Sequence, residues 1–249
     1  MDALDEISSM CKARRARVLI DAESQLYQFG ILDVGLDLMR KHNQDGYAIV
    51  FSTYQAYLKS TLSTVTEHLG IAAEGDFTFG LKIVRGAYID TDNRILIHDT
   101  KQDTDDTYDT LALGALRQDL GGFGGKHGRK FPSLNLLLAS HNKKSVLSAH
   151  ELHQHRLQEG LPTVPVGYAQ LQGMCDELSF GLLQMQSTGK GCLPEVFKCT
   201  TWGGLAECLG YLARRAGENR DAASRTQDEF LALRKETWRR LKRAFALGG

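Results

Sequence analysis

The sequence lacks the cysteine spacing of a disulfide-stabilised or zinc-binding protein. Its 249 residues include five cysteines, an odd number, and none of them forms a CxxC pair. Disulfide frameworks and zinc sites use cysteines in matched sets at short, recurring spacings. We therefore expect these cysteines to be reduced, as in a reducing compartment, and to be mostly structural.

Long hydrophobic runs and an excess of one charge are also missing. No apolar run approaches the roughly 20 residues that a membrane-spanning helix needs, and the segment MDALDEISSM (1–10) is too acidic for a signal or transit peptide. Lysine and arginine total 30, as do aspartate and glutamate. A chain without net charge has no general field that attracts nucleic acid. We expect no nucleic-acid partner, so partners must be sought in local motifs.

No segment rich in proline or serine divides the chain, which has four prolines. Its 42% hydrophobic and 24% charged residues are close to the averages for globular domains. A single α/β barrel can reach this length. We expect one domain over residues 1–249.

Short apolar, β-branched segments alternate with longer segments of helical period, which is typical of repeated βα units and a parallel sheet. About six units are visible, so the pattern fits an eight-fold barrel without its first units or an open doubly wound sheet. One helix is expected to end at Gly70, and the glycine-rich segment 121–125 is expected to be a mobile loop. The predicted strands are 17–23, 47–55, 79–88, 134–142, 164–172 and 195–203.

Polar side chains gather where these predicted strands end. The carboxyl ends of parallel strands meet at one edge of the sheet, where barrels and open α/β sheets place their sites. We therefore expect a site at that edge. The residues at or just beyond the strand ends are Asp21, Gln55, Tyr88, His141, Asn142 and Gln172.

The segment LKIVRGAY (81–88) carries two cations inside a predicted strand. Period two places Lys82, Gly86 and Tyr88 on one face and Arg85 on the other. If the first face lines a barrel, Lys82 supplies a cation, Gly86 a gap for a flat ligand, and Tyr88 a lid. In the alternative, Lys82 extends to solvent from a sheet edge and Gly86 is a turn residue.

The predicted helix near residue 211 places Tyr211, Arg214, Arg215 and Glu218 on one face, since they follow at i, i+3, i+4 and i+7. Paired arginines can bind a carboxylate through two parallel hydrogen bonds, and a nearby acid can hold one guanidinium. The alternative is a solvated helix face with an internal Arg214–Glu218 pair.

Two motifs resemble known sites but fail on spacing. HELHQH (150–155) has Gln154 where a zinc-protease helix needs its second histidine, so we expect surface histidines and no metal site. GGFGGKHG (121–128) has Leu120 where a phosphate-binding loop needs glycine, and His127 where that loop needs serine or threonine. We expect neither chemistry.

The segment from Thr226 to Leu247 predicts an amphipathic helix with a basic side. Such a helix can lie on an anionic membrane. We expect instead that it covers the body of its own domain.

Six collinear segments resemble the proline dehydrogenase family, and together they span nearly the whole chain. The resemblance implies a (βα)8 TIM-type barrel with bound FAD, here without its first two βα units. It also implies oxidation of L-proline to Δ1-pyrroline-5-carboxylate, with electrons passed to a quinone. A mitochondrial location, on the matrix side of the inner membrane and in peripheral contact with it, is implied as well. The matching segments are DAE (21–23), TYQAYLK (53–59), LKIVRGAY (81–88), ASHN (139–142), QLQGM (170–174) and YLARRAGEN (211–219).

The resemblance also implies roles for single residues. Arg214 and Arg215 would bind the proline carboxylate, and Asp21 and Glu218 would order their guanidinium groups. A positive charge at Lys82 would favour the reduced, anionic flavin. The proline ring would lie among Tyr88, Leu171 and Tyr211, and the flavin cofactor would contact Gln55, Lys82, Val84, Gly86, Ala87, His141 and Asn142.

The last predicted strand departs from the family pattern. Where the family usually has a Tyr-x-Pro-Tyr-Gly segment, this chain has Cys199 to Gly203, so Cys199 replaces a tyrosine that contacts substrate. The missing units would also remove a pocket lysine that the family normally supplies. Two alternatives therefore stay open: a non-catalytic member of the family, and a flavin dehydrogenase for a related imino acid such as hydroxyproline.

Overall fold

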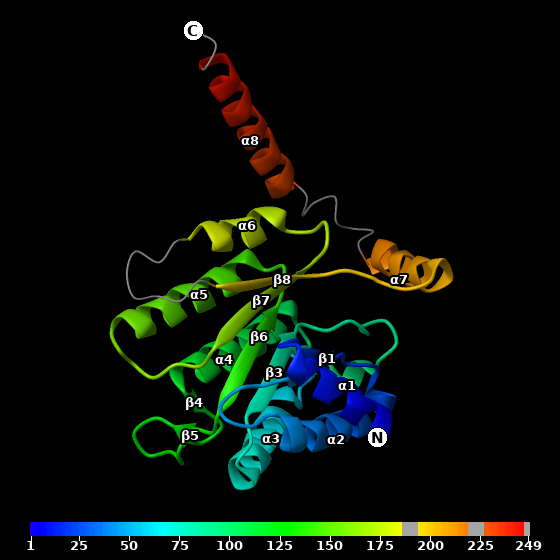
Figure 1. Ribbon diagram of the computed structural model, residues 1–249, viewed down its shortest axis with the longest axis vertical. Helices are drawn as coiled ribbons and strands as arrows, with labels where there is room; N and C mark the ends of the chain where they lie inside the picture. The colour runs from blue at the N-terminus through cyan, green and yellow to red at the C-terminus, as the bar shows by residue number, and fades with distance from the viewer. Residues whose placement is uncertain (186–193, 219–226, 247–249) are drawn as a thin grey trace.

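A parallel sheet forms the centre of the fold, and helices pack along its outer face (Figure 1). This computed structural model describes residues 1–185, 194–218 and 227–246, without the side chains of Arg214, Glu218, 227–229 and 244–246. Within those ranges, six strands pair in the order β1-β2-β3-β6-β7-β8. They are β1 (Val18–Ile20), β2 (Val50–Gln55), β3 (Phe79–Val84), β6 (Leu134–Ala139), β7 (Val166–Leu171) and β8 (Glu195–Cys199).

The helices follow the strands in the repeated βα order that the sequence predicts. All six predicted strands are present in shorter form, and the sheet has the arrangement of a half-barrel. The described helices are α1 (Asp2–Ala13), α2 (Gln25–His42), α3 (Thr61–Gly75), α4 (Lys101–Arg117), α5 (Lys143–Gln158), α6 (Asp176–Gln184), α7 (Leu205–Glu218) and α8 (Gln227–Ala246), with a 3-10 turn, η1 (Arg94–Leu96).

Alternation along the strands produces two apolar clusters on opposite faces of the sheet. The outer face packs against the helices through large side chains such as Phe79, Leu136 and Tyr168, which belong to the main core. The inner face carries a smaller cluster that includes Phe51 and Leu137. Most residues of the four inner strands β2, β3, β6 and β7 are buried, as expected for a parallel sheet that is covered on both faces.

Helix α3 does not end at Gly70, so that prediction was wrong. It continues to Gly75 and ends at Asp76, whose backbone is left-handed with φ of 48°. Leu69 and Ala72 on either side of Gly70 are buried in the core. Burial of this face stabilises the helix beyond the glycine, which by itself costs only about 1 kcal/mol in a helix interior.

The expected glycine-rich loop contains an antiparallel hairpin of β4 (Asp119–Leu120) and β5 (Phe123–Gly124). Phe123 is buried, and the guanidinium of Arg129 lies 4.1 Å from its ring centroid. At Gly121, with φ of 59°, a Cβ would lie 2.4 Å from Thr66 Oγ1 on α3. Glycine is therefore required where the hairpin approaches α3.

Arg17 joins the two edge strands of the sheet at their amino ends. Its Nη1 and Nη2 donate to Glu195 Oε2 and Oε1 at 2.8 and 3.3 Å. The guanidinium also lies 5.4 Å from the ring centroid of Tyr47 and 5.7 Å from those of Phe51 and Phe197. The side chain thus links the residue before β1 to β8 across the base of the half-barrel.

Helix α8 extends away from the sheet and contacts α6 (Figure 1). Leu231, Leu233, Trp238 and Leu241 are exposed on it. The expectation that this helix covers the body of its domain was therefore wrong for its described side chains. No helix in the described part of the chain is both long and apolar enough to cross a membrane.

The expectation of surface histidines on α5 was wrong for two of them. His150 and His153 are buried, and His153 Nδ1 lies 3.1 Å from Thr163 Oγ1. Burial, with a smaller contribution from His150, lowers the pKa of His153 to about 4. These histidines are therefore neutral core residues near pH 7.

Candidate active site

An ion pair between Lys82 and Asp21 lies at the carboxyl end of the sheet, on its inner face. The register places Ile20 beside Ser52 and Lys82 beside Thr53, so Asp21 and Lys82 stand at the same level on either side of β2. Lys82 Nζ donates to Asp21 Oδ1. The Lys82 side chain is 12% exposed and that of Asp21 is 73% exposed. The sequence predicted the inward cation but assigned Asp21 to the arginines of α7.

Gln55 connects the segments that follow β1 and β3. Its Nε2 donates to the Glu23 carbonyl at 3.2 Å, and its Oε1 accepts from the Ala87 N–H at 3.1 Å. Gln28 also accepts from the Glu23 N–H, at 2.8 Å, and Tyr88 donates its hydroxyl proton to Glu23 Oε2 at 2.5 Å. The buried amide of Gln55 therefore fixes the backbone on which Glu23 and Tyr88 meet.

Tyr57 explains the glycine that follows β3. Gly86 has φ of 151°, and a Cβ there would lie 2.3 Å from the Tyr57 ring. The prediction of a gap for a flat ligand at Gly86 was therefore wrong, because the Tyr57 ring fills that space. The Tyr57 hydroxyl donates to Asp92 Oδ2 at 2.6 Å, and Asp92 Oδ1 accepts from the Gln25 N–H at 3.0 Å. Burial and the bond to Asp92 raise the pKa of Tyr57. The sequence singled out neither Tyr57 nor Asp92, because their roles depend on contacts across the sheet.

Several groups that are predicted to contact a flavin form hydrogen bonds within the protein. The Val84 carbonyl accepts from the Ala56 N–H at 2.8 Å. His141 Nε2 accepts from the Leu171 N–H at 3.0 Å, which links the ends of β6 and β7. Asn142 Oδ1 accepts from the Ser145 N–H at 3.2 Å and caps the amino end of α5. Their contact with a flavin stays a prediction.

Helix α7 brings Tyr211 and Arg215 to the end of β8. The Arg215 guanidinium lies 5.3 Å from the centroid of the Tyr211 ring, and the Tyr211 hydroxyl lies 4.0 Å from Cys199 Sγ. Burial raises the pKa of Tyr211, Cys199 and Asp21 add to the increase, and Arg215 opposes it. The side chains of Arg214 and Glu218 are outside the described residues, so the predicted carboxylate clamp stays a prediction.

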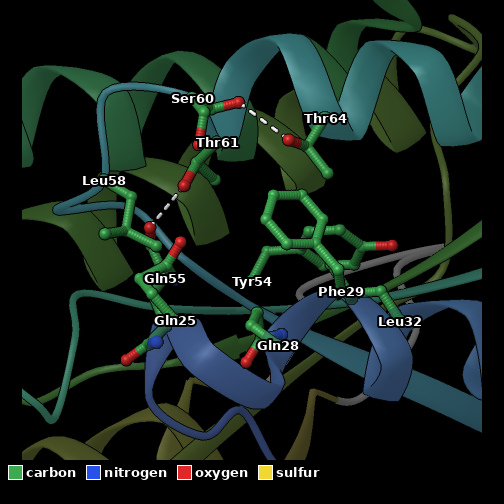
Figure 2. A pocket seen from close by; sticks show the side chains of 10 residues that line it. All are labelled: Gln25, Gln28, Phe29, Leu32, Tyr54, Gln55, Leu58, Ser60, Thr61 and Thr64. Atoms are coloured by element: carbon green, nitrogen blue, oxygen red, sulfur yellow. Dashed lines mark hydrogen bonds between the residues drawn. The ribbon is translucent and has the colours of Figure 1, made fainter. Parts of the chain in front are cut away.

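A small hollow adjoins Gln55 of this site, and a larger one lies at the other end of the sheet. Figure 2 shows one between β2 and helices α2 and α3, where Gln28, Phe29 and Tyr54 lie around a cavity of about 20 Å³. That space holds about one water molecule. The other, of about 630 Å³, lies at the amino ends of the strands beside Asn135 and Pro165. Barrel enzymes place their sites at the opposite, carboxyl end.

No group of three or more metal-binding side chains lies together among the described residues. The features at the carboxyl ends are instead a cation inside the sheet, a buried amide, and a tyrosine–arginine pair on the helix after β8. Together with the parallel βα sheet, they define a TIM-barrel-type protein whose polar groups gather at the end of the strands where such proteins place their sites.

A family profile described as proline dehydrogenase matches residues 3–228. The chain belongs to the proline dehydrogenase family. A probable mitochondrial proline dehydrogenase of Schizosaccharomyces pombe is 33% identical over 246 residues, which are 95% of this chain and 49% of that protein. The hydroxyproline dehydrogenase of Mus musculus is 33% identical over 248 residues, which are 97% of this chain and 51% of that protein. The chain thus spans about half the length of these relatives.

Solved structures support the fold. Proline utilization A (PutA) from Bdellovibrio bacteriovorus, inactivated by N-propargylglycine, superposes with a TM-score of 0.70 at 22% identity, covering 92% of this chain and 22% of that chain. A PutA structure with proline bound in remote sites gives a TM-score of 0.66 at 22% identity, covering 87% of this chain and 21% of that chain. The half-barrel therefore shares its fold with about a fifth of each of these PutA chains.

Proposed function

We propose that residues 1–249 form the barrel domain of an FAD-dependent proline dehydrogenase. The domain oxidises L-proline to Δ1-pyrroline-5-carboxylate and passes the electrons to a quinone. The observation that carries this proposal is the Lys82–Asp21 pair on the inner face of the sheet, near Tyr211 of α7. The cation within the sheet would serve the flavin, and the arginine beside Tyr211 would bind the carboxylate of an amino acid.

The residues present fit a flavin. A flavin ring needs small apolar neighbours along its faces and polar groups at its rim. On the inner face, Ala139 and Ala169 supply the former, and Lys82 supplies a charged donor. When bound, FAD accepts the hydride that leaves the ring carbon next to the proline nitrogen. We propose that Lys82 stabilises the negative charge of the reduced flavin, with Gln55, Val84, Gly86, Ala87, His141 and Asn142 as further contacts.

The substrate would lie between the cofactor and α7. Arg215, with Arg214, would bind the proline carboxylate and so orient the ring carbon. Tyr88, Leu171 and Tyr211 would enclose the ring and exclude water. Glu218 would order one guanidinium. Asp21 would hold the ammonium of Lys82 in place, and its negative charge would also act on Tyr211.

The relatives in fission yeast and Caenorhabditis elegans are named as mitochondrial proteins. We propose a mitochondrial location for this chain too, with peripheral contact on the matrix side of the inner membrane. The exposed apolar and basic residues of α8 suit such a contact, because basic amphipathic helices bind anionic lipid surfaces.

Anaerobic titration of the FAD-reconstituted protein with proline tests this function. We expect the oxidised flavin absorbance to disappear as proline is added and to return on addition of a soluble quinone. A matched titration with D-proline controls for nonspecific reduction. Flavin that binds but is not reduced by L-proline would contradict the proposed activity, and flavin that 4-hydroxyproline also fails to reduce would support a non-catalytic family member.

Hydroxyproline is a second candidate substrate, supported by Cys199. This side chain is exposed beside Tyr211 and is smaller than the tyrosine that the family places there, so it leaves room for a ring hydroxyl. Relatives named hydroxyproline dehydrogenase, including that of Homo sapiens at 32% identity, are similar over 97% of this chain. Initial rates on proline and 4-hydroxyproline distinguish the two substrates.

A further inference from the structure

Arg85 follows directly after β3, and its side chain points away from the inner face of the sheet. Its guanidinium enters the layer between the sheet and helices α4 and α5. There Nε donates to Asp105 Oδ1 at 2.6 Å, Nη1 to Ser140 Oγ at 2.5 Å, and Nη2 to Ser145 Oγ at 2.9 Å. The Arg85 side chain is 22% exposed, which is low for arginine.

Two of these bonds complete a ring with the turn that joins β6 to α5. Ser140 Oγ accepts from Arg85 and also from the Asn142 N–H at 3.0 Å. Asn142 Oδ1 accepts from the Ser145 N–H at 3.2 Å, and Ser145 Oγ accepts from Arg85. The ring encloses the turn that contains His141. Its conformation therefore depends on the guanidinium, which bonds to both ends of it.

The charge of Arg85 is compensated within the same layer. Burial alone would raise the pKa of Asp105, but its hydrogen bonds to Lys101 and Arg85 lower that pKa below its usual value. The guanidinium also stacks 4.3 Å from the centroid of the buried Tyr108 ring. A planar guanidinium can make this stack and three directed bonds at once, whereas a lysine ammonium cannot match the fork.

We propose that Arg85 is a positioning residue that holds the β6–α5 turn, and with it His141 and Asn142, in the conformation that binds the flavin. This rests on the proposed function, because His141 and Asn142 are proposed cofactor contacts. Arg85 acts from behind the sheet, while Lys82 acts on the inner face.

The first test measures the FAD dissociation constant of the apoprotein by flavin fluorescence. We expect Arg85→Met and Arg85→Lys each to weaken binding by about tenfold or more, since two charge-assisted hydrogen bonds are lost or misdirected. Arg156→Met is the matched control, because Arg156 also bonds to two segments, the carbonyls of Pro162 and Arg117, but at the opposite end of the sheet. It should leave the constant unchanged.

A second readout follows the turn itself, without flavin. Hydrogen exchange of amides 140–146 in the apoprotein should be faster in Arg85→Lys than in wild type, while exchange in β2, which makes no bond to this turn, stays the same. Ser140→Ala should weaken FAD binding as well. The double variant Arg85→Lys/Ser140→Ala should bind FAD about as weakly as the single variant with the larger loss of affinity, because both substitutions break the same ring of hydrogen bonds.

The outcomes separate the two proposals. Wild-type protein that binds no FAD overturns the proposed function and this inference together. Wild-type protein that binds FAD, with Arg85→Lys and Ser140→Ala binding it equally well and exchanging amides 140–146 at the wild-type rate, overturns the role of Arg85 alone. If Arg85→Met does not fold, the lysine and Ser140 variants still decide.

Discussion

Lys82 and Asp21 form an ion pair although 61 positions separate them in the chain. Parallel pairing of β1, β2 and β3 places them at the same level of the sheet. Lys82 is largely buried, whereas Asp21 is mostly exposed. A cation with few water contacts needs a counter-charge, and an exposed aspartate can supply it without being buried itself. The pair thus places a cationic side chain and its counter-charge together at the inner face.

Removing this cation should weaken the chemistry more than the fold. In Lys82→Met we expect reduction of bound flavin by proline to slow by about a hundredfold, because a charge aimed at the developing anion is lost. The reduction potential of the flavin should also become more negative. Lys59→Met is the matched control, since Lys59 forms an exposed pair with Asp99 away from the inner face. Equal flavin potentials in all three proteins would contradict this role.

The side chain at position 199 should set the choice between proline and hydroxyproline. In Cys199→Tyr we expect kcat/KM for proline relative to 4-hydroxyproline to rise by about tenfold or more, because the larger ring fills the space for a hydroxyl. Initial rates on both substrates measure the ratio. Cys11→Ser, in α1, controls for loss of a thiol. An unchanged ratio would show that Cys199 does not line the pocket.

Acid should destabilise the protein through His153. Its pKa is about 4 when folded, against an ordinary value of 6.5, so the unfolded chain binds more protons between these values. The free energy of unfolding should therefore fall as the pH falls from 6.5 to about 4, by at most about 3 kcal/mol from this group.

Urea unfolding at pH of about 7 and about 5 measures the effect. His153→Gln should show a smaller difference between the two conditions, because glutamine does not titrate. His155→Gln is the control, since His155 is exposed on the same helix. An undiminished pH dependence in His153→Gln would assign the effect to other groups.

The Arg17–Glu195 pair should couple the two edges of the sheet. A double-mutant cycle with Arg17→Met and Glu195→Gln should give a coupling energy of about 1 kcal/mol, falling as salt is added. The value is modest because the Glu195 side chain is 53% exposed. Arg17→Met alone should cost more than Glu195→Gln, since Arg17 also loses its contacts with three aromatic rings.

The exposed pair Arg40–Asp37 on α2 is the reference cycle for that measurement. Its coupling energy should be smaller, because both of its partners are on one helix and well solvated. Equal couplings in the two cycles would mean that Arg17 does not hold the sheet edges together.

Much of the fold is readable from local pattern. Apolar β-branched segments locate the six strands of the parallel sheet, and the period of Leu32, Leu36 and Met39 predicts the buried face of α2. The two-residue period of a strand also predicts that Lys82 and Arg85 point in opposite directions, and in the structure they lie on opposite faces of the sheet. The helix past Gly70 and the buried His153 could not be read this way, because burial against neighbouring elements overrides the local signals.

The sequence by itself determined the βα order, the family and the face on which Lys82 lies, because backbone alternation and residue type depend only on near neighbours along the chain. Only the tertiary structure decided that Asp21 pairs with Lys82, that Tyr57 packs against Gly86, and that Arg85 supports the β6–α5 turn. Each of these contacts joins different strands or helices. Their partners are selected by strand register and helix packing, which a one-dimensional pattern does not contain.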